Sequence, residues 1–216
     1  MWPSNQHCGA TFEDLFEPIF VSRVAYRNKL VLRINEHKNT AVPQIPKLDN
    51  DIIVFDSCYS PFNLEDIRSA GTSYIQVVLN TLKPKTEIIE EVERLTSRFV
   101  KPTVGVHIRL GDFHQEKRVI PIERYINAVK KIKNQLGLEP QCYVASDGKN
   151  EELVPFLSRF RCIKGNFYAP KDTIKGVREA LIDLLVLART DFIVQSPLSS
   201  FGNVAAFLGK VNSIQA

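Results

Sequence analysis

Apolar runs and apolar stripes alternate along the second half of this 216-residue chain. A short apolar run at 104–108 is typical of a buried strand, and apolar residues then recur at helical spacing from Pro121 to Leu136. The same succession of strand and helix continues to the end of the chain. It predicts a parallel sheet covered on both faces by helices, a Rossmann-type α/β fold. The later strands are expected at 142–145, near Cys162 and at 191–195, and the later helices from Asn150, at 177–188 and at 201–208.

The first hundred residues carry a less regular pattern. Two strand-like runs, LVLRI from Leu30 and DIIVF from Asp51, are separated by a loop that contains prolines. A helix is expected after Pro84, with Thr86 as its N-cap. We therefore predict a smaller N-terminal part, residues 1–100, and a Rossmann-type part, residues 101–216.

Composition narrows the class of protein. The hydrophobic fraction of 44% and the charged fraction of 24% are ordinary for a globular domain. No run of 18 apolar residues occurs, so no membrane span is expected. The basic residues behind the net charge of +4 are dispersed, which argues against nucleic-acid binding.

The four cysteines form no CxxC pattern, so we expect no metal site and no disulfide framework. Cys142 and Cys162 lie in strand-like runs and are interpreted as buried thiols. We expect a reducing, cytoplasmic setting, with a lumenal catalytic fragment as the alternative.

Polar residues follow three of the predicted strands. Because the carboxyl ends of parallel strands meet at one edge of the sheet, where ligands bind, these side chains should converge. They are His107, Arg109 and Asp112 at the first strand, Ser146 and Asp147 at the second, and Ser196, Ser199 and Ser200 at the last.

His107 and Arg109 belong to an H-x-R-x-G-D sequence and project to the same face of their strand. An arginine on an apolar strand needs an anionic partner, and its planar fork matches two phosphate oxygens. The alternative is a structural ion pair between Arg109 and Asp112, and the residues alone do not decide between the two. A lone His107 would be typical of a core histidine.

Asp183 is the one charged residue in ALIDLLVLA, residues 180–188, a helix that is apolar on every other side. A buried carboxylate must find donors, and the Watson–Crick edge of guanine offers a suitable pair of N–H groups. A helix cap or a bond to a neighbouring loop is the alternative. Ser199 and Ser200 lead into the last helix, where they suit either phosphate binding or ordinary capping.

Three segments of the chain, taken in order, resemble the three motifs of the fucosyltransferases of the α1,2-, α1,6- and protein O-fucosyltransferase type. They are VGVHIRLGDF (104–113), YVASDGKNEEL (143–153) and REALIDLLVLARTDFIVQSPLSSFGNVAAFLG (178–209). The resemblance extends to the bacterial nodulation-factor and N-glycan α1,6 type, although the first motif ends in GD as in the α1,2 type. The opening WPSNQHCGATFEDLF also resembles such proteins. The resemblance implies a GT-B-like pair of lobes, with a partial acceptor-side lobe in residues 1–100 and a nucleotide-sugar lobe in residues 101–216.

The resemblance further implies an inverting, metal-independent transfer of fucose from GDP-fucose to a glycan acceptor, with no cofactor. Arg109, beside His107, would hold the β-phosphate and stabilise the leaving GDP. Asp183 would bind guanine, and Ser199 and Ser200 would bind phosphate. Asp147 would lie near the ribose or the fucose.

Asp112 and Glu116, which follow the first motif, are the candidates for the catalytic base, and Glu116 is preferred. Gly148 stands where some relatives carry a second aspartate, and the glycine-rich segment that precedes the WP sequence in relatives is absent. A partner or an oligomer is therefore expected to complete the N-terminal lobe. A truncated, inactive GDP-binding module and an enzyme for another nucleotide sugar remain alternatives.

Overall fold

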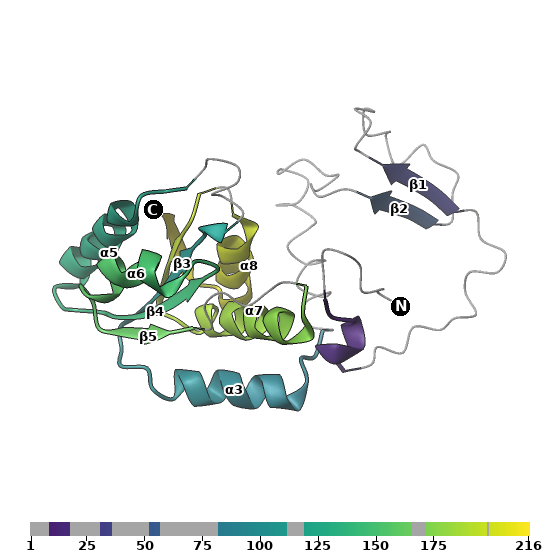
Figure 1. Ribbon diagram of the computed structural model, residues 1–216, viewed down its shortest axis with the longest axis horizontal. Coiled ribbons are helices and arrows are strands. Elements are labelled where there is room, and N and C mark those ends of the chain that lie inside the picture. The colour runs from purple at the N-terminus through teal and green to yellow at the C-terminus, as the bar shows by residue number, and fades with distance from the viewer. Residues whose placement is uncertain are drawn as a thin grey trace. The chain divides into compact units, whose positions relative to one another are not determined.

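The computed structural model describes residues 9–17, 31–35, 52–56, 82–111, 119–165, 172–197 and 199–216 (Figure 1). The chain divides into two compact units, Pro18–Leu82 and a larger one made of Met1–Glu17 and Lys83–Ala216. In the smaller unit, β1 (Val31–Asn35) and β2 (Ile52–Asp56) pair in parallel, which confirms both predicted N-terminal strands. An acceptor-side lobe in residues 1–100 stays a prediction.

The larger unit is built on a five-stranded sheet in the order β5-β4-β3-β6-β7, and every neighbouring pair is parallel. The predicted α/β class with a Rossmann-type parallel sheet is confirmed. The short edge strand β7 was not predicted from the sequence. The strands are β3 (Thr103–Ile108), β4 (Gln141–Ser146), β5 (Cys162–Lys164), β6 (Phe192–Gln195) and β7 (Asn212–Gln215).

The helices follow the predicted stripes closely. Thr86 was predicted as an N-cap but is the first helical residue, and Lys85, which has no oxygen to accept a capping bond, holds the cap position. Gly137 ends its helix with φ of 70°, as expected for a left-handed terminal residue. The elements are η1 (Phe12–Asp14), α3 (Thr86–Thr96), α5 (Ile122–Leu136), α6 (Asn150–Leu157), α7 (Ile174–Leu187) and α8 (Ser200–Gly209). Within the described segments, no helix combines the length and apolar character needed to cross a membrane.

Two apolar cores lie on the two faces of the sheet. Val104, Val106 and Ile108 face α5 and α6, whereas alternate residues such as Tyr143 and Ile193 face α3, α7 and α8. Cys142 is buried and Cys162 is partly buried in the first core, and neither forms a disulfide within the described residues. The period-two alternation therefore places His107, which follows Val106, on the face covered by α7 and α8.

The order of the strands creates a switch point in the sheet. From the central strand β3 the chain builds β4 and β5 on one side, and it then returns to build β6 and β7 on the other side. In sheets of this kind, ligands bind beyond the carboxyl ends of the two strands that flank the switch. Here those strands are β3 and β6, which end at Ile108 and Gln195.

Candidate functional site

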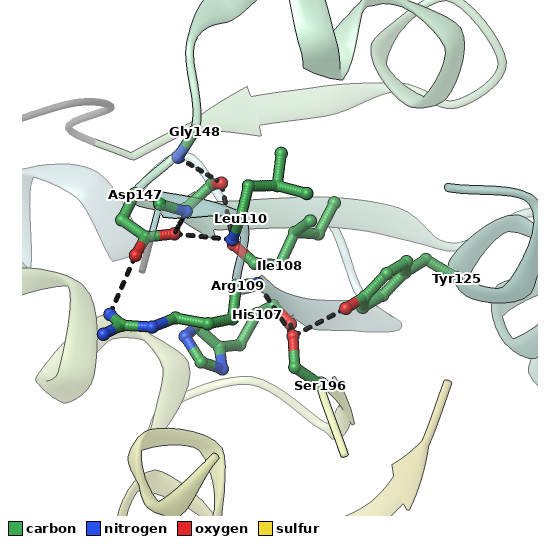
Figure 2. A network of polar contacts seen from close by, with 10 residues as sticks. His107, Ile108, Arg109, Leu110, Tyr125, Asp147, Gly148 and Ser196 are labelled. Carbon is green, nitrogen blue, oxygen red and sulfur yellow. Dashed lines mark hydrogen bonds and ion pairs between the residues drawn. The ribbon is translucent and has the colours of Figure 1, made fainter. Parts of the chain in front are cut away.

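Arg109 and Asp147 meet beyond the carboxyl ends of β3 and β4 (Figure 2). The Arg109 Nη1 atom lies 2.9 Å from Asp147 Oδ2, and the two side chains are 24% and 20% exposed. Asp147 Oδ1 accepts hydrogen bonds from the backbone N–H groups of Leu110, at 2.7 Å, and Gly111, at 3.1 Å. One carboxylate therefore fixes the turn after β3 and faces the guanidinium.

The glycine of the H-x-R-x-G-D sequence leaves room for that carboxylate. A Cβ atom at Gly111 would lie 2.8 Å from Asp147 Oδ2, closer than side chains tolerate. Gly148 is confined in a similar way, because its Cβ would lie 3.1 Å from the Cβ of Leu110. The sequence SDGK thus fits a turn packed directly against Leu110.

Ser196 connects the end of β6 to the end of β3. Its Oγ accepts a hydrogen bond from the Arg109 backbone N–H at 2.7 Å and donates to the His107 carbonyl oxygen at 3.2 Å. The phenol oxygen of Tyr125, which projects from α5, lies 2.6 Å from the same Oγ (Figure 2). Ser196 therefore holds the backbone of Arg109 directly, and Asp147 holds the two residues that follow it, Leu110 and Gly111.

His107 is buried beside Arg109, and its ring centroid lies 4.8 Å from that of Phe201. Burial lowers the pKa of His107 to about 4; the Asp147 carboxylate opposes this effect and Arg109 adds to it. The imidazole is therefore neutral at pH 7. Among the described residues its Nδ1 atom has no hydrogen-bond partner, which is uncommon for a buried ring nitrogen.

The amino terminus of α8 lies next to this group, since Phe201 belongs to its first turn. Ser199 is the N-cap and is half-buried, and Ser200 is exposed. The Ser199 hydroxyl makes no capping hydrogen bond to the described backbone. The first N–H groups of a helix carry partial positive charge, so this terminus can accept an anion.

Asp183 lies on α7 and is buried against β4. Tyr143 Oη donates a hydrogen bond to Asp183 Oδ1 at 2.6 Å, which satisfies part of this carboxylate. The sequence alternative of a bond to a neighbouring loop is thus replaced by a bond to a residue of β4. A Cβ atom at Gly165, just beyond β5, would lie 2.6 Å from the same oxygen. Asp183 therefore lies near the carboxyl end of β5, on the sheet face that also carries His107.

The structure thus brings together His107, Arg109, Asp147 and the start of α8, whereas Asp183 lies apart from them, buried on the face of the sheet near the end of β5. Asp112 and Glu116 lie outside the described residues. The sequence placed Ser196 at a strand end without giving it a role, and it missed Tyr125. Tyr125 shares the apolar stripe of α5, and a buried phenol there needs a partner, which is the signal that could have revealed it.

No family model matches the sequence, and no curated protein is similar to it in sequence. Comparison with solved structures places the chain in a class, the Rossmann-type α/β proteins with the fold of fucosyltransferases, as the motifs predicted.

Two such structures are those of NodZ. NodZ alpha-1,6-fucosyltransferase soaked with GDP-fucose is 22% identical with a TM-score of 0.54, over 74% of this chain and 52% of that one. Fucosyltransferase NodZ from Bradyrhizobium is 21% identical with a TM-score of 0.55, over 78% and 55%. The chain spans about half the length of these structures.

Proposed function

We propose that this protein binds GDP-fucose at the carboxyl edge of its parallel sheet and transfers fucose to a glycan acceptor with inversion and without a metal ion. The observation that carries the proposal is Arg109, a partly exposed guanidinium beyond the central strand, two residues after His107, whose ring contacts Phe201 at the amino end of α8. A diphosphate needs positive charge and N–H donors, and these two elements supply both.

In this proposal Arg109 holds the β-phosphate and stabilises the negative charge that develops on the leaving GDP. A fixed cation does this without reorganising during the reaction, so the proposed transfer uses no metal ion. Ser199 and Ser200 add their hydroxyls and the first N–H groups of α8. His107 is neutral, so its Nδ1 is available to a ligand polar group without adding charge.

Asp183 binds the guanine ring in the same proposal. It lies near the end of β5, two strands from β3, which corresponds to roughly 10 Å at the usual spacing between strands. A guanine nucleotide extended along the edge of the sheet would place its base at Asp183 and its diphosphate at Arg109. Asp147, at the intermediate strand β4, then lies near the ribose or the fucose.

The remaining roles rest on the family resemblance. Glu116, or else Asp112, would accept the proton of the acceptor hydroxyl. Residues 1–100 would contribute to the acceptor side, and a cytoplasmic location stays a prediction.

Binding and turnover are separate proposals, because the chain spans about half the length of the solved fucosyltransferases. The second candidate function is accordingly a GDP-binding module without transferase activity of its own. A chain that is stabilised by GDP but releases no fucose from GDP-fucose in the presence of glycan acceptors would have this function.

A nucleotide panel tests the proposal. The melting temperature of the protein is measured with GDP, GMP, ADP and UDP, for the wild type and for Arg109→Ala. At a hundredfold excess over Kd, GDP should raise the melting temperature by about 5–10 °C. Arg109→Ala should abolish this shift. Arg159→Ala, which removes an exposed arginine after α6, is the control and should keep it. An equal response to every nucleotide, or no response, would contradict the proposal.

A further inference from the structure

We propose that Tyr125 and Ser196 are positioning residues for the diphosphate site, setting the place of Arg109 without touching the ligand. The inference rests on the proposed function and deepens it. The resemblance to fucosyltransferases assigns neither residue a contact with the ligand. Tyr125 belongs to α5, which covers the face of the sheet opposite to the one that carries His107.

The donors and acceptors around the Ser196 hydroxyl determine the direction of its hydrogen bonds. A serine hydroxyl has one hydrogen to donate and can accept two bonds. The Arg109 N–H can only donate to Oγ, and the His107 carbonyl oxygen can only accept from it. With the single Ser196 hydrogen on the His107 carbonyl oxygen, the phenol of Tyr125 is the donor in the third contact. With all three bonds made, the Ser196 hydroxyl is fully satisfied and has a single orientation.

The Tyr125 phenol is itself held in place by the packing of the core around it. Its side chain is fully buried in the core formed by α5, α6 and the sheet. Burial raises the pKa of the Tyr125 phenol, so the group remains a donor throughout the working range of pH. A fixed phenol thus fixes the Ser196 hydroxyl, which in turn fixes the backbone nitrogen of Arg109.

The position of that nitrogen matters because the Arg109 side chain starts from the same residue. Small displacements of a group that binds a reacting phosphate have large effects on affinity and rate. Asp147 holds the guanidinium end, so Ser196 and Asp147 together determine both ends of the side chain. Loss of the Tyr125 hydroxyl would release the Ser196 hydroxyl to rotate and would loosen the first of these two restraints.

The experiment compares GDP with GMP, because GMP lacks the β-phosphate proposed to lie on Arg109. Affinities of both nucleotides are measured by competition with a fluorescent GDP analogue for the wild type, Tyr125→Phe and Ser196→Ala. Each substitution should weaken GDP binding about tenfold, the effect of one lost hydrogen bond acting at a charged site. GMP binding should change by less than about twofold, because its phosphate does not use Arg109 in the same way.

Thr190→Val is the matched control. It removes a buried hydroxyl that lies 2.8 Å from the Leu187 carbonyl oxygen and 3.0 Å from the Phe192 carbonyl oxygen, next to the amino end of β6, and that can donate to one of them at a time. It should lower stability and leave the ratio of GDP to GMP affinity unchanged.

Three results separate the possible failures. If Tyr125→Phe and Ser196→Ala bind GDP as the wild type does, the positioning role is wrong. If they weaken GDP and GMP equally, the hydroxyls act only as a structural lock, and the role is again wrong. If the wild type binds no GDP at all, the proposed function itself fails.

Discussion

Asp147 and Asp191 hold the two ends of the central strand β3 in the same manner. Asp191 accepts a hydrogen bond from the Thr103 N–H at 2.8 Å and pairs with Lys101 at 3.1 Å, where the strand begins. Asp147 does the same for the turn after the strand and pairs with Arg109. Only Asp147 lies where the proposed ligand binds. Substitutions of Asp147 and Asp191 therefore form a matched pair, which separates an effect on binding from an effect on stability.

Asp147→Asn and Asp191→Asn should have similar effects on stability and different effects on anion binding. Each asparagine keeps an oxygen acceptor for the backbone and loses the charge that faces the cation. Each should therefore lower the free energy of unfolding in urea by about 1 kcal/mol. Asp147→Asn should also bind inorganic pyrophosphate about tenfold more tightly, since it removes a negative charge next to Arg109.

Isothermal titration calorimetry with pyrophosphate measures this difference, with Asp191→Asn as the control that should match the wild type. Unchanged binding by Asp147→Asn would show that its pairing with Arg109 does not control the affinity for anions, and weaker binding would show that the carboxylate aids binding by holding the guanidinium in place.

His107 should make the stability of the protein depend on pH in mildly acidic solution. Its pKa is lowered to about 4 in the folded state, against an ordinary value of 6.5 when unfolded. Between these values the unfolded chain binds the proton and the folded one does not, so stability falls as pH decreases from 6.5 to 4. The loss attributable to this group should reach roughly 3 kcal/mol.

Urea unfolding of the wild type and His107→Gln at pH 7, 5.5 and 4.5 isolates this contribution, since other titrating groups affect both proteins alike. The difference in unfolding free energy between the two proteins should shrink or reverse as pH falls. A constant difference over this range would mean that His107 titrates normally.

Asp183→Asn should change which purine the site prefers. An ionised carboxylate accepts from the two N–H groups of guanine, whereas an amide presents one acceptor and one donor. GDP should therefore bind at least about tenfold more weakly, whereas xanthosine diphosphate, which has a carbonyl oxygen in place of the guanine amino group, should bind more tightly. The Tyr143 phenol can still donate to the amide oxygen, so folding should be preserved.

Competition binding with both nucleotides, together with circular dichroism to verify folding, checks this prediction. Undiminished GDP affinity in a folded Asp183→Asn protein would remove Asp183 from the base-binding site.

The sequence predicted the centre of the sheet well because β3 and β4 are buried along their whole length and the helices carry clear stripes. The run around Val106 and the stripe that includes Ile126 are local patterns, readable within a few residues. It missed β7, whose residues Asn212–Gln215 are exposed and show no apolar pattern. It also misplaced the N-cap at Thr86, because capping depends on backbone angles at Lys85.

For the site, the sequence predicted which strand ends carry chemistry but not the partners. Arg109 pairs with Asp147, 38 positions away, whereas the alternative considered from the sequence was the nearby Asp112. Tyr125 and Ser196 are likewise distant along the chain. Such pairs arise only from the order in which strands are placed in the sheet, and residue spacing contains no information about that order.

The position of β6 beside β3 has a kinetic consequence. Residues 109 and 196 are neighbours across the sheet but 87 positions apart along the chain, with β4 and β5 between them in sequence. Contacts between such remote segments form slowly, because a long loop must close before they contribute any stability. A nucleotide that contacts both strands would therefore bind only after β3 and β6 have paired. Its binding would slow the separation of these two strands.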